Sequence, residues 1–191
     1  YFPVYKPKSD ELLPYFVTVA NGTIDEDKVR EGNEAVIRAR FEDAQFFYEL
    51  DRKSTLVDMR PKLSGTTFQK ELGSLLDKTV RVEKSIDGLA ELCQVDGEGR
   101  RVAQEAAHIY RADLATSTVM EMTALAGIMG KHYALMEGQS PPVATAIFES
   151  VLPRNAGDVL PTSVAGSLLS AADKVDSLVG LFACVCGPTA S

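Results

Sequence analysis

The sequence has few cysteines, almost no histidine and no long apolar run. Its 191 residues include three cysteines, Cys93, Cys184 and Cys186, and two histidines, His108 and His132. Three unevenly spaced cysteines do not make a disulfide framework, and a Cys-x-Cys pair without a nearby histidine is a poor zinc site. We therefore expect all three thiols to be reduced, which suits a cytosol, stroma or matrix.

Sequence signals of several other protein classes are also missing. No run approaches the roughly 18 apolar residues of a membrane span, and we expect neither a signal peptide nor a transit peptide within these residues. A G-x-S-x-G motif is absent, and Gly97-Glu98-Gly99 lacks the strand and third glycine of a dinucleotide-binding loop. Because the chain starts abruptly at Tyr1 and stops abruptly at Ser191, we expect it to be an internal fragment of a longer protein.

Charge is unevenly distributed along this acidic chain, whose net charge is −7. From Lys28 to Lys84 there are 12 basic and 10 acidic residues, a net of +2. From Ser85 onward there are 6 basic and 12 acidic residues, a net of −6. Any surface that faces phosphate groups is therefore predicted in the first half. The alternative is that these lysines and arginines only solvate helix faces.

The predicted fold is mostly α, a helical bundle preceded by a β-hairpin and a long helix. Residues 1–5 and 15–20 are rich in aromatic and β-branched residues and are predicted to form the two hairpin strands. A two-stranded hairpin is marginally stable alone. We therefore assign 1–24 to the remnant of an upstream sheet-containing domain, and 25–188 to a helical domain.

The helical domain begins with a long linking helix, within residues 25–60. Apolar residues recur on one helical face from Val29 to Tyr48, so the helix is expected to run from about Asp25 to Lys53, with a break near Gly32. Apolar spacing and turn residues predict further helices at 55–59, 68–76, 77–93, 101–110, 114–135, 143–151 and 163–184, a turn at 97–99 and a loop at 152–161.

Three strings, taken in order, are more specific than this generic pattern. Residues 33–53 read N-E-x-V-I-R-A-R-F-x-D-A-x-F-F-Y-x-x-D-R-K, residues 127–134 read G-x-M-G-x-x-Y-A, and residues 172–180 read A-D-K-x-D-x-L-x-G. Together with Leu152-Pro153-Arg154 and Gly157-Asp158 between them, they resemble the β subunit of the bacterial-type, two-subunit glycyl-tRNA synthetase. The resemblance extends from Tyr1 to about Pro188.

This resemblance implies a part of a glycine–tRNA ligase, which activates glycine with ATP and transfers it to tRNA. The adenylation site, with its ATP and Mg, belongs to the α subunit in this family, so no cofactor is expected in this fragment. The implied partners are the glycine tRNA and the α subunit or α region, with no membrane. The implied location is a chloroplast or mitochondrion in a plant, towards which residues 115–130 incline us, and otherwise a bacterial cytoplasm.

The candidate tRNA contacts are basic residues of the first half. Because Arg38 and Arg40 point about 200° apart on a helix, one of them is expected to pair with a neighbouring acid. The acids within reach are Glu34, Glu42 and Asp43. The full set of candidates comprises Arg38, Arg40, Arg52, Lys53, Lys78 and Arg81.

The resemblance also implies an HD-like helical domain, named for a His-Asp metal motif. A working site of that kind needs histidines and carboxylates that converge on one or two metals. Here Ala112 occupies the histidine position before Asp113, and the late aspartate is Asp173. His108 lies five residues before Asp113, on a different face, and His132 lies nineteen residues after it.

We therefore expect a degenerate HD pocket formed by Arg111, Asp113 and Asp173, with no metal and no catalytic residue. Burying an unpaired carboxylate costs several kcal/mol. The two aspartates are accordingly expected to be hydrogen-bonded or ion-paired, with Arg111, Lys174 and Lys78 as the candidate partners.

Three functions remain open on this basis. The first is a non-catalytic helical part of the synthetase that positions tRNA, which the basic first half and the ordered strings favour. The second is an HD-type metal-dependent phosphohydrolase, which would require a metal near Asp113 and Asp173. The third is a structural module for subunit contacts, which the acidic second half favours.

Overall fold

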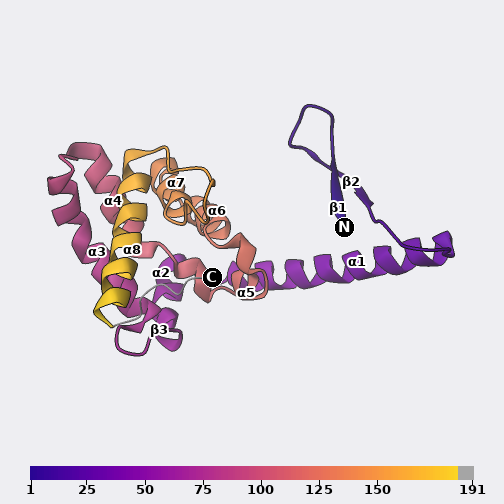
Figure 1. The fold of residues 1–191 in the computed structure, drawn as a ribbon, viewed down its shortest axis with the longest axis horizontal. Helices are drawn as coiled ribbons and strands as arrows, with labels where there is room; N and C mark the ends of the chain where they lie inside the picture. Colours follow the sequence, from indigo (N-terminus) through magenta and orange to yellow (C-terminus); the bar gives the residue numbers. More distant parts are fainter. Residues whose placement is uncertain (185–191) are drawn as a thin grey trace. The chain divides into compact units, whose positions relative to one another are not determined.

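A computed structural model describes residues 1–184 of the chain, so Cys186 and the end of the predicted domain at 188 lie outside the described residues. The chain divides into two compact units, Tyr1–Asp43 and a larger unit that begins at Ala44. The prediction of a mostly helical fold is confirmed: within residues 1–184 an N-terminal β-hairpin precedes the long helix α1, and seven further α-helices follow. Figure 1 shows their arrangement along the chain. No helix in residues 1–184 is both long and apolar enough to cross a bilayer.

The first unit contains the hairpin and most of α1. Strands β1 (Phe2–Tyr5) and β2 (Leu12–Val17) pair antiparallel, with Phe2 opposite Val17, so the second strand begins earlier and ends earlier than predicted. Helix α1 (Glu26–Asp51) has acidic residues in its first turn, where their negative charge interacts favourably with the helix dipole. The break expected at Gly32 is wrong, because one glycine costs only about 1 kcal/mol in a helix interior.

The second unit is a helical bundle around an alanine-rich core. Helix α4 packs against α3, α7 and α8 (Figure 1). Its buried residues Ala103, Ala106 and Ala107 are small, so neighbouring helices approach closely. The helices of this unit are α2 (Leu56–Met59), α3 (Leu75–Leu92), α4 (Gly97–Ile109), α5 (Ser117–Glu121), α6 (Ile128–Met136), α7 (Pro141–Glu149) and α8 (Val164–Ala183), with 3₁₀ segments at Arg60–Gly65, Ala112–Ala115 and Thr123–Leu125.

The helix predicted at 68–76 is wrong. Strands β3 (Thr67–Gln69) and β4 (Gly73–Ser74) form a short hairpin there, and Gly73 adopts a φ of +85°. Helix α3 then begins at Leu75, because Ser74 and Asp77 form a reciprocal capping box. The apolar residues of this stretch therefore do not lie on one helix, because the turn at Gly73 and the start of α3 separate them.

The single helix predicted at 114–135 is also wrong. The chain there forms a 3₁₀ turn, α5, a second 3₁₀ turn and α6. Gly127, with a φ of +78°, separates α6 from the preceding turn. The turn predicted at 97–99 is in fact the first turn of α4, which begins at Gly97.

Candidate functional site

Asp173 of α8 lies at the centre of a buried ionic cluster. Arg111 donates to it with two nitrogens, Nε to Oδ1 at 2.9 Å and Nη2 to Oδ2 at 2.7 Å. The Lys78 ammonium lies 3.4 Å from Oδ1 and donates to the Asp173 carbonyl oxygen at 2.9 Å. The Tyr110 hydroxyl donates to the same carboxylate at 3.2 Å. These contacts confirm that Asp173 is ion-paired with Arg111 and Lys78.

Asp176, one turn further along α8, extends the cluster. It accepts from Arg81 Nε at 2.7 Å, Arg81 Nη2 at 3.1 Å and Lys78 Nζ at 3.2 Å. Two carboxylates thus pair with three cationic side chains, so positive charge exceeds negative charge in the cluster. Lys174 was expected as a partner of the aspartates, but its ammonium donates instead to the Leu152 carbonyl oxygen at 2.6 Å.

The contacts within this cluster shift the pKa values of Asp173 and Tyr110. Burial raises the pKa of Asp173, but the hydrogen bonds and charge of Arg111, together with the charge of Lys78, outweigh burial and hold that pKa below its ordinary value. Burial, with the charge of Asp173, raises the pKa of Tyr110 well above its ordinary value. Asp173 is therefore ionised and Tyr110 is a neutral donor at neutral pH.

The donor set of this pocket does not fit the metal of an HD hydrolase. Both oxygens of Asp173 already accept from the Arg111 guanidinium, and the Lys78 ammonium lies beside them. A divalent cation would add to a site in which positive charge already exceeds negative charge. Across residues 1–184 no group of three or more His, Cys, Asp and Glu side chains is arranged to hold a metal.

Asp113 has different partners from Asp173. It is 2% exposed, and its Oδ2 accepts from the backbone N–H of Gly127 at 2.6 Å and of Gly130 at 3.1 Å. Asp113 therefore caps the N-terminus of α6 from a distant segment. A Cβ at Gly130 would lie 3.1 Å from Oδ2 and 2.9 Å from Ile147 Cγ2, which explains the second glycine of the G-x-M-G string.

Two further buried carboxylates cap helices in the same remote manner. Asp51, at the end of α1, accepts from the N–H of Ser117 at 2.7 Å and of Thr118 at 2.8 Å, the start of α5. Glu149 of α7 accepts from the N–H of Thr162 at 2.8 Å and also binds Ser163, just before α8. Sequence reasoning missed both, because their partners are not neighbours along the chain. Asp51, Asp113 and Glu149 thus hold the starts of α5, α6 and α8, whereas Asp173 is ion-paired.

The raised pKa of the Asp113 carboxyl predicts a pH dependence of folding stability. Burial raises the pKa of its carboxyl, against the opposing effect of the Gly127 and Gly130 N–H groups. Between the unfolded and the raised folded pKa the native state binds more protons, so stability falls as pH rises through this window. In Asp113→Asn, which keeps an acceptor and loses the charge, this fall should be absent. Urea unfolding of both proteins from pH 4 to pH 7 measures it, and parallel profiles would contradict it.

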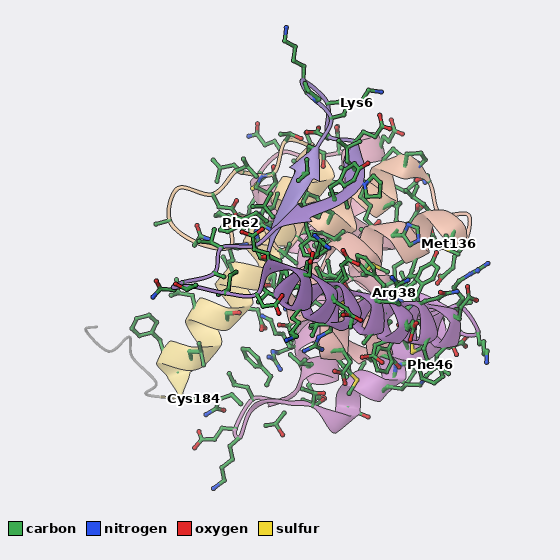
Figure 2. All side chains as sticks on the ribbon, turned by 90° about the vertical axis from the view of Figure 1, so that its right-hand side faces the viewer. Phe2, Lys6, Arg38, Phe46, Met136 and Cys184 are labelled. Atoms are coloured by element: carbon green, nitrogen blue, oxygen red, sulfur yellow. The ribbon has the colours of Figure 1, made fainter. Side chains whose placement is uncertain are left out.

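The basic candidates of α1 are exposed and have no ion pair among residues 1–184. Arg38, carried on α1 in Figure 2, and Arg40 are both solvent-exposed. The expected pairing of one of them with Glu34, Glu42 or Asp43 is wrong. Such exposed helix pairs contribute only about 0.3–0.5 kcal/mol, so nothing compels them to form.

Of the other four candidates, two are exposed to solvent and two are held by contacts within the bundle. Lys53 is exposed without an ion pair among the described residues, and Arg52 lies 3.3 Å from Glu49. Lys78, by contrast, is 1% exposed, and Arg81 is held by Asp176 and the Leu72 carbonyl oxygen. The interior position of Lys78 removes it from the residues that a phosphate group can reach.

The two histidines lie in separate clusters, away from both aspartates. His108 Nδ1 is 2.9 Å from Glu83 Oε1 and 2.6 Å from Arg60 Nη1. His132 Nε2 is 2.8 Å from the Tyr48 hydroxyl. The Arg60–Glu83–His108 cluster has no signal in the local sequence, because its members come from three separate elements.

Comparison with known proteins agrees with the strings found in the sequence. The family model described as glycyl-tRNA synthetase beta subunit matches residues 1–191. The chain is 48% identical over 184 residues to "Glycine--tRNA ligase, chloroplastic/mitochondrial 2" of Arabidopsis thaliana, which covers 96% of this chain and 17% of that protein. It is 41% identical over 192 residues to the glycine–tRNA ligase beta subunit of Acaryochloris marina, covering 100% of this chain and 27% of that protein.

A third relative extends the comparison to another bacterial group. The glycine–tRNA ligase beta subunit of Listeria monocytogenes is 43% identical over 192 residues, covering 100% of this chain and 28% of that protein. The chain therefore spans less than a third of the length of each of these relatives.

Proposed function

Because the chain belongs to the glycyl-tRNA synthetase beta subunit family, we propose that it is a non-adenylating part of a glycine–tRNA ligase β subunit. Its role is to help position the glycine tRNA during ATP-dependent glycylation. Its partners are that tRNA and the α subunit or α region, which binds ATP and Mg. The similarity to a plant protein named chloroplastic/mitochondrial supports an organellar location for this chain.

The observation that carries this proposal is the different state of two sets of basic side chains. Arg38, Arg40 and Lys53 are exposed and have no ion pair among the described residues. Lys78 and Arg111 are held inside the bundle by ion pairs with Asp173 and, for Lys78, also with Asp176. Exposed, uncompensated cations are the groups that replace condensed counterions on a phosphate backbone. The proposed tRNA contacts are therefore Arg38, Arg40, Lys53 and the more weakly paired Arg52.

The domain assignment is part of the same proposal. We assign the hairpin at 1–24 to a larger sheet of the full-length subunit, and residues 25–188 to an HD-like domain whose metal pocket is degenerate. The closing of that pocket by Arg111 and Lys78 supports a scaffold role in place of hydrolysis. A phosphohydrolase is not proposed, since the donor set does not fit its metal.

Binding of the glycine tRNA by the full-length synthetase tests the proposal. We expect Arg38→Ala, Arg40→Ala or Lys53→Ala to weaken binding about equally for all tRNA sequences. Each substitution that removes a cation from a phosphate group should also reduce the salt slope by about 1. Fluorescence titration at several salt concentrations measures both quantities. Arg101→Ala, which removes an exposed arginine of α4 that already pairs with Glu105, is the matched control.

The result that contradicts the proposal is equally concrete. If all three variants bind tRNA with the affinity and the salt slope of Arg101→Ala, these residues make no phosphate contact. Circular dichroism of each variant checks that helix content is unchanged, so that weaker binding is not mistaken for unfolding.

A further inference from the structure

Helix α8 carries an apolar stripe on its solvent-facing side. Five large apolar side chains of this one helix are between 52% and 62% exposed. They are Val164, Val175, Leu178, Val179 and Phe182. Single exposed apolar residues are ordinary in soluble proteins, but a contiguous patch marks a surface that another molecule or segment covers.

The polarity of α8 is inverted relative to an ordinary surface helix. Its charged residues Asp173, Lys174 and Asp176 are buried or half-buried, and each is engaged by groups of the bundle. Within α8, every residue of which is described, no charged side chain is exposed. A helix whose charged side chains face the bundle and whose apolar side chains face solvent is expected to lie between two layers of protein.

The spacing of the stripe indicates what covers it. Successive apolar positions alternate by four and three residues, the heptad spacing that receives the side chains of a second helix. Leu168 is 4% exposed, so the bundle already covers this one position, and the continuous open part of the stripe runs from Ala171 to Phe182. The series is Val164, Leu168, Ala171, Val175, Leu178 and Phe182.

The area of the stripe argues against a second copy of the chain. A helix of 20 residues is about 30 Å long and about 10 Å wide, so its face offers roughly 300 Å². Pairing two copies through α8 would bury roughly 600 Å², about half of what a specific, stable interface between separate proteins needs. A segment of the same polypeptide needs no such area, because tethering supplies a high effective concentration.

We infer that in the full-length β subunit an amphipathic helix from outside residues 1–191 packs along this α8 stripe. The relatives have room for it, since 72–83% of their length lies outside the matched region. The covering helix presents an uncharged apolar seam of the same spacing, because a charge placed there would be buried without a partner. This inference uses the family membership but is independent of the proposed tRNA contacts.

Thiol accessibility in the full-length subunit tests the inference. The probe is a maleimide reagent applied to Leu178→Cys, with Cys184 and Cys186 replaced by alanine and labelling followed by peptide mass spectrometry. Lys84→Cys, on the charged face of α3, is the matched control. We expect position 178 to react about tenfold or more slowly than position 84 after correction for their rates in denaturant. Equal corrected rates would overturn the inference.

Dilution and the α subunit then identify the occupant. Protection at position 178 should be unchanged on dilution of the β subunit alone. Protection that disappears on dilution indicates a second copy, and protection that requires the α subunit indicates that partner; either outcome overturns the inference. A photo-crosslinking residue at position 182 should join a peptide of the same polypeptide from outside residues 1–191, and a crosslink within those residues would contradict it.

Discussion

Replacing Arg111 with methionine is expected to lower the free energy of unfolding by about 3–5 kcal/mol, because it leaves a buried carboxylate without its bidentate partner. Asp173 is 4% exposed and would keep only the Lys78 ammonium, at 3.4 Å, and the Tyr110 hydroxyl. Urea denaturation at neutral pH, followed by circular dichroism, measures the loss. Adding Asp173→Asn to Arg111→Met should recover part of it, since the uncompensated charge is then removed.

A surface ion pair of the same type provides the control. Arg101 pairs with Glu105 at 2.6 Å on the exposed side of α4, so Arg101→Met should cost less than about 1 kcal/mol. A similar cost for Arg111→Met and Arg101→Met would show that the buried pair does not stabilise the bundle.

The same pair determines an acid-sensitive contribution to stability. The folded pKa of Asp173 lies below its ordinary value, so its contribution is fully present above the unfolded pKa and is lost as pH falls through the folded pKa. In Arg111→Met this acid-side loss should be smaller, because the group that lowers the pKa has been removed.

Replacing Asp51 with alanine is expected to cost about 2–4 kcal/mol, since two amide N–H groups at the start of α5 lose their acceptor. Asp51 is 3% exposed, and its Oδ2 also accepts from the Tyr133 hydroxyl at 3.2 Å. Asp51→Asn should cost less, because its side-chain oxygen can still accept one N–H. Urea unfolding gives the stability, and hydrogen exchange at Ser117 and Thr118 should become faster in Asp51→Ala.

An exposed cap of ordinary local type is the comparison for Asp51. Asp58 closes the capping box of α2 with Thr55, three residues away, and its removal should cost about 1 kcal/mol. Unchanged exchange at Ser117 and Thr118 in Asp51→Ala would mean that the remote carboxylate does not hold the start of α5.

Part of the ionic cluster is predictable from the sequence: the pairing of Lys78 with a buried aspartate is expected and confirmed, but the burial of its side chain is not expected. The resemblance places Arg111 and Asp173 in one pocket, and the cost of burying charge predicts an ion pair for Asp173. A tRNA contact at Lys78 would need an exposed side chain, whereas Lys78 precedes Val82 and Ile86 at intervals of four residues and so shares their buried helix face. A lysine that lies four residues from the apolar core positions of the same helix is the sequence signal for a buried ammonium group.

The sequence by itself determined the helical class, the long helix α1, the family and the scarcity of histidine, because helical periodicity, the ordered strings and residue identity are all carried by the linear order. Only the tertiary structure decided where the helix predicted at 114–135 is interrupted. It also decided that Asp51, Asp113 and Glu149 bind backbone N–H groups at the starts of distant helices. Finally, it decided that α8 buries its charged side chains and exposes its apolar stripe. The physical reason is that a buried charge is stabilised by whichever partner folding brings within about 3 Å, and Asp51 and Ser117 are 66 residues apart.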